Sequence, residues 1–215
     1  MRTYISPIGF NSTSVTRPLL SRGIDSGDEI VLIRPDVEEL DPRAEEAMAD
    51  VERLLQEIEP DVSVTTERIT HTDFETAVLE CSDLIRAAEG DRIVTLGGGA
   101  RDVLVPFVIA AIAHVQLLDA ALFFSDIDGT VQEWALPRLT ATLHETTQPT
   151  LAALEAQGGE ASIPTLTDVT QQSKSTVTRH VNSLAEEGLI EVWTEGKTKH
   201  ARLALPGELL LRNES

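Results

Sequence analysis

Cysteine is almost absent from this 215-residue chain, and the other residue types that bind metals are dispersed along it. Cys81 is the single cysteine, so no intramolecular disulfide can form, and its position on an apolar helix face predicts a small buried residue. The five histidines are scattered, without the spacing typical of metal ligands. We therefore expect neither a disulfide-stabilised fold nor a metal site, and no cofactor.

Long hydrophobic runs are also missing. The longest apolar run, residues 103–115, is too short to span a bilayer and is interrupted by Pro106 and His114. No secretory signal precedes Tyr4. The sequence therefore predicts a cytoplasmic protein with no membrane partner.

Lysine is scarce, and its distribution divides the chain. The net charge is −19, but residues 1–148 carry 11 arginines, no lysine and 27 acidic residues, whereas residues 149–215 carry 6 basic and 9 acidic residues. All three lysines (Lys174, Lys197 and Lys199) lie in the second stretch, which concentrates cationic side chains where phosphates could be bound. The acidic surplus resembles proteins from cells with high internal salt, such as haloarchaea, and the alternative is an ordinary acidic cytosolic protein.

Residues 165–190 have the pattern of a helix-turn-helix. In the second helix, Val177, Val181 and Leu184 recur at i, i+4 and i+7 and form one apolar face. Ser173 is placed to cap the start of this helix, and Gly188 follows its end. The opposite face is polar and suits base edges and phosphates in a DNA groove. We predict that this helix contacts double-stranded DNA through Lys174, Ser175, Thr176, Arg179 and His180.

A strand pair is predicted directly after this helix. Residues 189–194 and 199–205 have strand-like patterns, and the turn between them contains Gly196. A strand pair in this place is typical of the wing of a winged helix, and Lys197 and Lys199 could neutralise phosphates there. The alternative is a small helical pair with an ordinary hairpin and a solvated basic face. The order of the elements and the placement of the bases favour the winged helix.

Strands alternate with helices over residues 1–135. The expected strands begin near Tyr4 and cover residues 29–33, 62–69, 92–96 and 120–125. This alternation predicts a parallel sheet with right-handed crossovers. We therefore predict an α/β protein in which a Rossmann-like sensor domain (residues 1–136) is followed by a connector (137–149) and a winged helix-turn-helix domain (150–215).

Two loops stand out at the carboxyl edge of the predicted sheet, where ligands of such folds bind. The first covers residues 6–13, and the second is the turn formed by Gly97, Gly98 and Gly99 before Arg101. Glycines at a strand-to-helix turn let backbone amides approach an anion. Neither loop has a Walker lysine or the dinucleotide fingerprint. A tight turn into a closely packed helix is the alternative explanation of the three glycines.

The order of residues in both loops resembles the CARF domains, the CRISPR-associated Rossmann-like sensors. The first loop and its surroundings contribute Ser6, Gly9, Phe10, Asn11, Val15, Arg17, Gly23 and Gly27-Asp28-Glu29, and the second loop contributes the glycine turn with Arg101. With the C-terminal winged helix, the whole chain resembles the CARF winged-helix transcription regulators of archaeal CRISPR systems. The resemblance implies a homodimer that binds a cyclic oligoadenylate, the tetra-adenylate, between two such domains. The ligand-binding residues that it implies are Gly9, Phe10, Asn11, Ser12, Gly97, Gly98, Gly99 and Arg101.

Three functions are consistent with this pattern. The first is a transcription regulator that binds a promoter or leader region under control of the cyclic oligoadenylate. The second is a slow ring nuclease that cleaves this ligand; Ser12, Thr13 and Arg101 could assist, but no general base is evident. The third is a MarR- or ArsR-like regulator that senses another metabolite. One departure from the CARF pattern is Ala100, which stands where many relatives have a polar or basic residue.

Overall fold

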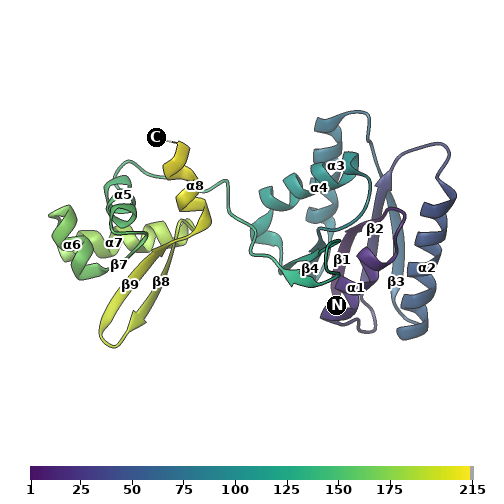
Figure 1. The fold of residues 1–215 in the computed structure, drawn as a ribbon, viewed down its shortest axis with the longest axis horizontal. Coiled ribbons are helices and arrows are strands. Elements are labelled where there is room, and N and C mark those ends of the chain that lie inside the picture. The colour runs from purple at the N-terminus through teal and green to yellow at the C-terminus, as the bar shows by residue number, and fades with distance from the viewer. Residues whose placement is uncertain (214–215) are drawn as a thin grey trace. The chain divides into compact units, whose positions relative to one another are not determined.

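The computed structural model describes residues 1–213 and divides the chain into two compact units, Met1–Leu136 and Pro137–Ser215 (Figure 1). Each unit has its own hydrophobic core. No helix among the described residues is long and apolar enough to cross a membrane.

The first unit is built on a six-stranded sheet of order β3-β2-β1-β4-β5-β6. Its first five strands are parallel: β1 (Arg2–Pro7), β2 (Glu29–Pro35), β3 (Ser63–Ile69), β4 (Asp91–Thr95) and β5 (Ala120–Phe124). This order is that of the Rossmann fold, so the predicted fold class is confirmed. The short strand β6 (Val131–Glu133) pairs antiparallel with β5 after a turn at Gly129, and so closes one edge of an otherwise parallel sheet.

Two pairs of helices cover the two faces of this sheet. Ile5, Val31 and Val94 point to the face covered by α3 (Phe74–Ala87) and α4 (Arg101–Ala113). Tyr4, Ile30 and Ile93, each one residue earlier along the strands, point to the face covered by α1 (Thr13–Arg22) and α2 (Pro42–Ile58). Because alternate residues of a strand face opposite sides, a strand buried on both faces is hydrophobic throughout.

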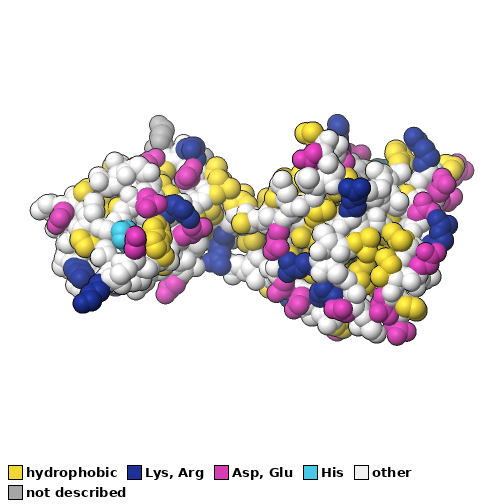
Figure 2. All heavy atoms as spheres, turned by 60° about the horizontal axis from the view of Figure 1, so that its bottom comes forward, with side chains coloured by type: hydrophobic (Ala, Val, Ile, Leu, Met, Phe, Trp, Pro, Cys, Tyr) yellow, Lys and Arg dark blue, Asp and Glu magenta, His cyan; other side chains and the backbone are white. Residues whose placement is uncertain are grey.

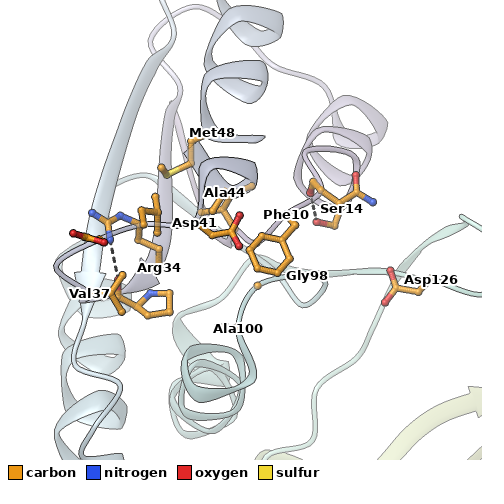
Figure 3. A pocket seen from close by; sticks show the side chains of 17 residues that line it. Phe10, Ser14, Arg34, Val37, Asp41, Ala44, Met48, Gly98, Ala100 and Asp126 are labelled. Atoms are coloured by element: carbon orange, nitrogen blue, oxygen red, sulfur yellow. Dashed lines mark hydrogen bonds between the residues drawn. The ribbon is translucent and has the colours of Figure 1, made fainter. Parts of the chain in front are cut away.

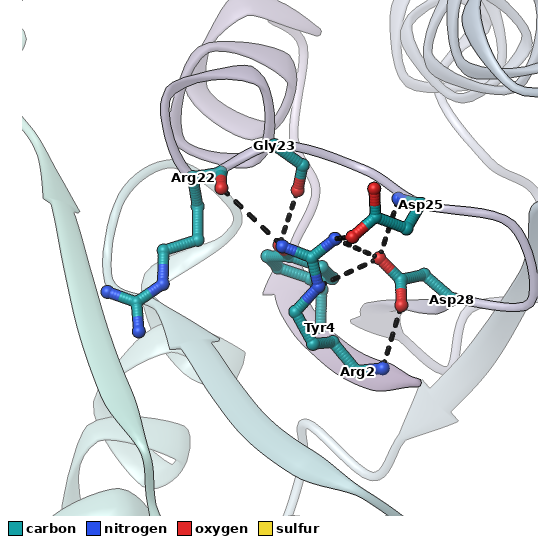
Figure 4. A network of polar contacts seen from close by, with 6 residues as sticks. All are labelled: Arg2, Tyr4, Arg22, Gly23, Asp25 and Asp28. Atoms are coloured by element: carbon teal, nitrogen blue, oxygen red, sulfur yellow. Dashed lines mark hydrogen bonds and ion pairs between the residues drawn. The ribbon is translucent and has the colours of Figure 1, made fainter.

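A network of polar contacts ties the amino-terminal edge of the sheet together (Figure 4). The buried carboxylate of Asp28 accepts hydrogen bonds from the backbone N–H of Arg2 (2.8 Å), from Nε of Arg2 (3.0 Å) and from the backbone N–H of Asp25 (2.9 Å). The hydroxyl of Tyr4 donates to the carbonyl of Gly23 (2.6 Å). These contacts link the start of β1, the end of α1 and the start of β2.

The second unit is a winged helix, as predicted. Its helices are α5 (Gln148–Ala156), α6 (Ile163–Thr170), α7 (Lys174–Glu186) and α8 (Leu205–Asn213), and its three-stranded sheet has the order β7-β9-β8. The strands β8 (Ile190–Glu195) and β9 (Thr198–Leu203) form the wing, and β7 (Glu160–Ser162) pairs with β9. The apolar face of α7, formed by Val177, Val181 and Leu184, lies in the core of this unit. Strand β7 and helix α8 were not predicted.

Residues predicted as a connector pack onto this second unit. Leu143 contacts the core of the winged helix, and Arg138 donates from Nη1 to the carbonyl of Glu186 at 2.8 Å. The backbone N–H of Thr142 donates to Glu187 Oε2 at 3.3 Å. The segment before α5 therefore belongs structurally to the second unit.

Candidate functional site

The two predicted ligand loops meet at the centre of the sheet. Strands β1 and β4 are neighbours, and the helices that follow them, α1 and α4, lie on opposite faces. Loops that diverge in this way form the crevice in which Rossmann folds bind ligands. The two loops are in close contact, because a Cβ built on Gly9 would lie 3.1 Å from the backbone nitrogen of Gly99.

The glycine turn has a backbone that other residues rarely adopt. Gly98 and Gly99 have φ angles of +80° and +82°. A Cβ on Gly98 would collide with Ser14 Oγ, and a Cβ on Gly99 would lie 2.7 Å from the Cβ of Pro7. The third glycine, Gly97, is buried against Phe124. The positive φ angles, together with the close approach of α1 at Gly98 and of β1 at Gly99, therefore require glycine at these two positions.

Gly98→Ala is expected to destabilise the first unit more than Gly27→Ala does. Both glycines have a φ of +80°, so both variants introduce the left-handed strain of about 1–2 kcal/mol. Nothing lies within 4 Å of a Cβ at Gly27, whereas at Gly98 the methyl group collides with Ser14, which adds about 1–3 kcal/mol of overpacking. Urea unfolding of the two full-length variants measures the difference. Equal losses would mean that Ser14, in the first turn of α1, moves aside at no cost in free energy.

A cavity of about 510 Å³ opens beside these loops, a size in the range of small-molecule sites (Figure 3). Five predicted ligand residues line it: Gly9, Phe10, Asn11, Gly98 and Gly99. Three others do not. Ser12 precedes α1 and accepts backbone hydrogen bonds through its carbonyl, Gly97 is buried, and Arg101 is exposed at the first residue of α4. The cavity thus includes most, but not all, of the predicted set.

Phe10 is a surface residue of this cavity and not a core anchor. Its side chain is 60% exposed, and the guanidinium carbon of Arg43 lies 4.2 Å from the centre of its ring. Arg43 in turn donates two hydrogen bonds to the carboxylate of Asp41, at 2.9 and 3.1 Å. The same carboxylate caps α2 by accepting from the backbone N–H of Arg43 at 2.9 Å. These bonds lower the pKa of Asp41 and raise that of Arg43, so both remain charged.

The segment between β2 and α2 forms the other wall of the cavity, which the sequence analysis did not predict. It contributes Val37, Glu39, Leu40 and Asp41, while Arg34 and Pro35 come from the end of β2 and Ala44 and Met48 from α2. Arg34 donates from Nη1 to the carbonyl of Pro35 at 2.9 Å. Its Nε is buried without a hydrogen-bond partner among the described residues. Because β2 ends at the same sheet edge as β1, its position in the alternating pattern could have indicated this wall.

The exposed side of α7 forms the candidate DNA-binding surface. The helix begins at the cap Ser173, whose hydroxyl accepts from the backbone N–H of Thr176 at 3.2 Å. A shallow depression on the helix is lined by polar and charged side chains: Lys174, Ser175, Thr178, Arg179, Asn182, Ser183 and Glu186. The wing is tied to this helix, because Lys199 donates from Nζ to Asn182 Oδ1 at 2.6 Å. Lys197 is exposed in the turn between β8 and β9.

The basic side chains of this surface are set in an acidic protein. On the face drawn in Figure 2, acidic side chains are scattered over both units with basic ones among them. The ammonium of Lys174 and the guanidinium of Arg179 have no hydrogen-bond or ion-pair partner within residues 1–213. Two cations without internal partners are therefore available on α7 for an external anion.

The prediction that His180 contacts DNA is wrong. Its side chain is only 6% exposed, and its Nδ1 is hydrogen-bonded to the hydroxyl of Thr150 at 2.9 Å. Position 180 is three residues after Val177, so it lies on the buried side of α7. Burial, with a smaller contribution from Arg179, lowers the pKa of the His180 imidazole. His180 therefore packs the winged helix internally as a neutral side chain.

The burial of His180 predicts that the stability of the second unit depends on pH. The pKa of His180 is lower in the folded protein than its ordinary value of about 6.5 in the unfolded chain. At pH values above the pKa of the unfolded chain, neutral His180 contributes its full stabilisation to the second unit. As the pH falls below that pKa, this contribution decreases, because the unfolded chain then gains a proton that the folded protein does not. Thermal unfolding across this range should show a shallower decrease for His180→Gln than for the wild type. Identical pH profiles of the melting temperature for the two proteins would contradict the conclusion that His180 is buried in its neutral form.

Comparisons with known proteins agree with both units. Residues 2–128 match the Csa3 CRISPR-associated Rossmann-like domain, and residues 149–199 match the MarR family. No curated protein sequence matches the chain. No group of three or more His, Cys, Asp or Glu within the described part of the chain is placed to hold a metal ion.

Three solved structures illustrate the structural similarities. BpsR of Bordetella bronchiseptica, whose DNA binding is regulated by 6-hydroxynicotinic acid, is 22% identical and aligns over 33% of this chain and 52% of its own, with a TM-score of 0.31. HlyU from Vibrio cholerae is 22% identical over 35% of this chain and 84% of its own (TM-score 0.28). Csm6 of Enterococcus italicus, bound to cyclic hexa-2'-fluoro-hexa-dAMP, is 11% identical over 86% of this chain and 54% of its own (TM-score 0.48). The chain thus spans about half the length of BpsR and of Csm6.

The chain combines a winged helix with a Rossmann-like unit that has a cavity at its topological switch point. This combination defines the class of DNA-binding regulators that carry a Rossmann-like domain beside the winged helix. Because the match covers more than half of its residues, the chain belongs to the family of the Csa3 CRISPR-associated Rossmann-like domain. Together with the MarR-type region, this makes it a CRISPR-associated regulator.

Proposed function

We propose that this protein is a transcription regulator whose first unit binds a cyclic oligoadenylate, cyclic tetra-adenylate, at the interface of a homodimer. The winged helices of the two copies bind double-stranded DNA in a promoter or leader region. The observation that carries the proposal is the ligand-sized cavity beside the contacting loops after β1 and β4, in a chain that also has a helix-turn-helix with unpaired cations.

The chemistry of these loops suits a phosphodiester ligand. The first unit has no lysine, so phosphates would be held by backbone amides of the glycine turn, by the amino-terminal end of α4 and by Arg101. The Asn11 side chain offers a donor and an acceptor for ribose or phosphate. A cyclic ligand with two-fold symmetry could contact the same loops in two copies of the chain.

The coupling between ligand and DNA follows from dimer geometry. Paired recognition helices of a dimer must lie about 34–36 Å apart to enter successive major grooves. A ligand held between two sensor units favours the dimer arrangement to which it binds more tightly, and so changes the fraction of dimers with the correct helix separation.

The test measures DNA affinity with and without the ligand. Anisotropy of a labelled promoter duplex is titrated with the full-length protein, with and without cyclic tetra-adenylate. The acidic composition suggests a haloarchaeal origin, so the titration is done at both low and molar potassium chloride. We expect an affinity change of about 5- to 150-fold, and sedimentation should give one ligand per two chains. A chain that binds DNA but not this ligand would instead be a regulator of another metabolite.

A further inference from the structure

The exposed side of α7 carries a stripe of side chains that ends beside the wing. Ser175, Arg179 and Asn182 follow one another at i, i+4 and i+7, and all three line the shallow depression on this helix. With a rise of about 1.5 Å per residue the stripe is about 10 Å long, which corresponds to roughly three base-pair steps of DNA. The opposite side of α7 is buried in the core of the second unit. The stripe is therefore the part of α7 that a major groove would receive.

Lys199 of the wing fixes the orientation of the Asn182 side chain. Its Nζ donates to Asn182 Oδ1 at 2.6 Å, although the two residues are 17 positions apart in the sequence. An amide side chain can ordinarily turn over and exchange its oxygen and nitrogen, because the two ends have nearly the same shape. An ammonium group has donors only, so the oxygen must face Lys199 and Nδ2 must point away from it. The backbone of Lys199 is held in β9, where it pairs with Thr194 of β8.

We propose that Asn182, positioned by Lys199, selects guanine in the DNA site. The proposal rests on the DNA binding of the proposed function, and it adds the residues that choose a base. Guanine presents two acceptors in the major groove, N7 and O6, whereas adenine presents one acceptor beside an amino donor. The Nδ2 of Asn182 and the remaining protons of the Lys199 ammonium are all donors, so together they match guanine.

The contact with Lys199 also prevents the usual pairing of asparagine with adenine. That pairing needs both ends of the amide, because Oδ1 accepts from the adenine amino group while Nδ2 donates to N7. Here the Oδ1 of Asn182 already accepts from Lys199, so the adenine amino group would have to approach an ammonium. Donors that face each other without an acceptor remain unpaired, which is costly in a desolvated interface. Without Lys199, the amide of Asn182 would be free to turn and pair with adenine.

The test begins with the selection of binding sites from a random library of DNA duplexes. The full-length wild type and Asn182→Ala are compared, and the position at which the variant loses its preference identifies the base pair that Asn182 contacts. We expect guanine at this position in the wild type. Replacement of that guanine by adenine should weaken wild-type binding by at least about fivefold in an anisotropy titration. Lys199→Met should bind the adenine duplex at least as tightly as the guanine duplex.

Lys197→Met is the matched control for Lys199→Met. Lys197 is exposed in the turn of the same wing, and its ammonium has no hydrogen-bond or ion-pair partner among residues 1–213. Its loss should weaken binding to both duplexes by the same factor and reduce the slope of log K against log salt by about 1. The preference for guanine should stay unchanged in this control.

Two results would overturn the role of Asn182 and Lys199 while leaving the regulator intact. One is a Lys199→Met variant that loses affinity equally for both duplexes and keeps the preference for guanine, because a lysine that only supports the wing would behave in this way. The other is an Asn182→Ala variant that selects the same sites as the wild type. A wild type that enriches no sequence at all would overturn the proposed function, and this inference with it.

Discussion

Replacement of Asp28 by alanine is expected to lower the free energy of unfolding of the first unit by about 3 kcal/mol. The carboxylate of Asp28 is 1% exposed, pairs with the guanidinium of Arg2 at 2.8 Å and accepts two backbone N–H bonds. Removal of one partner of a buried ion pair leaves the other charge and its donors uncompensated. The effect falls at the low end of the usual range because Arg2 keeps its contact with Asp25 at 2.5 Å.

Asp25 provides the matched control for this variant. It pairs with the same guanidinium, but its side chain is 83% exposed. Asp25→Ala should therefore cost less than about 1 kcal/mol, as exposed ion pairs do. Urea unfolding can be followed by the fluorescence of Trp134, which stacks on Phe123 in the first unit, in a Trp193→Phe background. A loss for Asp28→Ala as small as that for Asp25→Ala would show that the buried carboxylate contributes little to stability.

Local patterns along the chain were sufficient to predict both folds. The alternation of strands with helices predicted the parallel sheet, which the structure confirms. The spacing of Val177, Val181 and Leu184 identified the recognition helix. The glycines at positions 98 and 99 marked the turn after β4, because residues other than glycine rarely adopt their positive φ angles. Each of these features depends on neighbours in sequence, which is why the sequence predicts them.

Features that depend on residues distant in sequence were missed. The wall formed by Arg34 and Glu39 becomes part of the site only because β2 lies beside β1 in the sheet. His180 was assigned to the polar face by residue type, but Thr150 of another helix provides a partner that allows it to be buried. Strand β7 is three residues long and exists through its pairing with β9. Short elements of this kind carry too little periodicity to be predicted alone.

Arg179→Ala is expected to weaken DNA binding by about 1–3 kcal/mol, which corresponds to roughly 5- to 150-fold in affinity. Arg179 is exposed on α7 and has no ion-pair partner in the part of the chain that the structure describes, so its charge is fully available to a phosphate or a guanine edge. A variant that loses a phosphate contact should also reduce the slope of log K against log salt by about 1. A variant that loses a base contact should lower specificity while leaving that slope unchanged.

Arg212 provides the control for this experiment. It is an exposed arginine of the same unit, but it lies on α8 and its Nη1 is paired with Glu208 at 3.1 Å. Arg212→Ala should therefore leave DNA affinity within about 0.5 kcal/mol of the wild type, because α8 is not the recognition helix. Both variants should bind the sensor ligand normally, since neither residue lies in the first unit. If both arginines contribute equally to DNA affinity, binding depends on the overall charge of the unit and α7 is not the reading element.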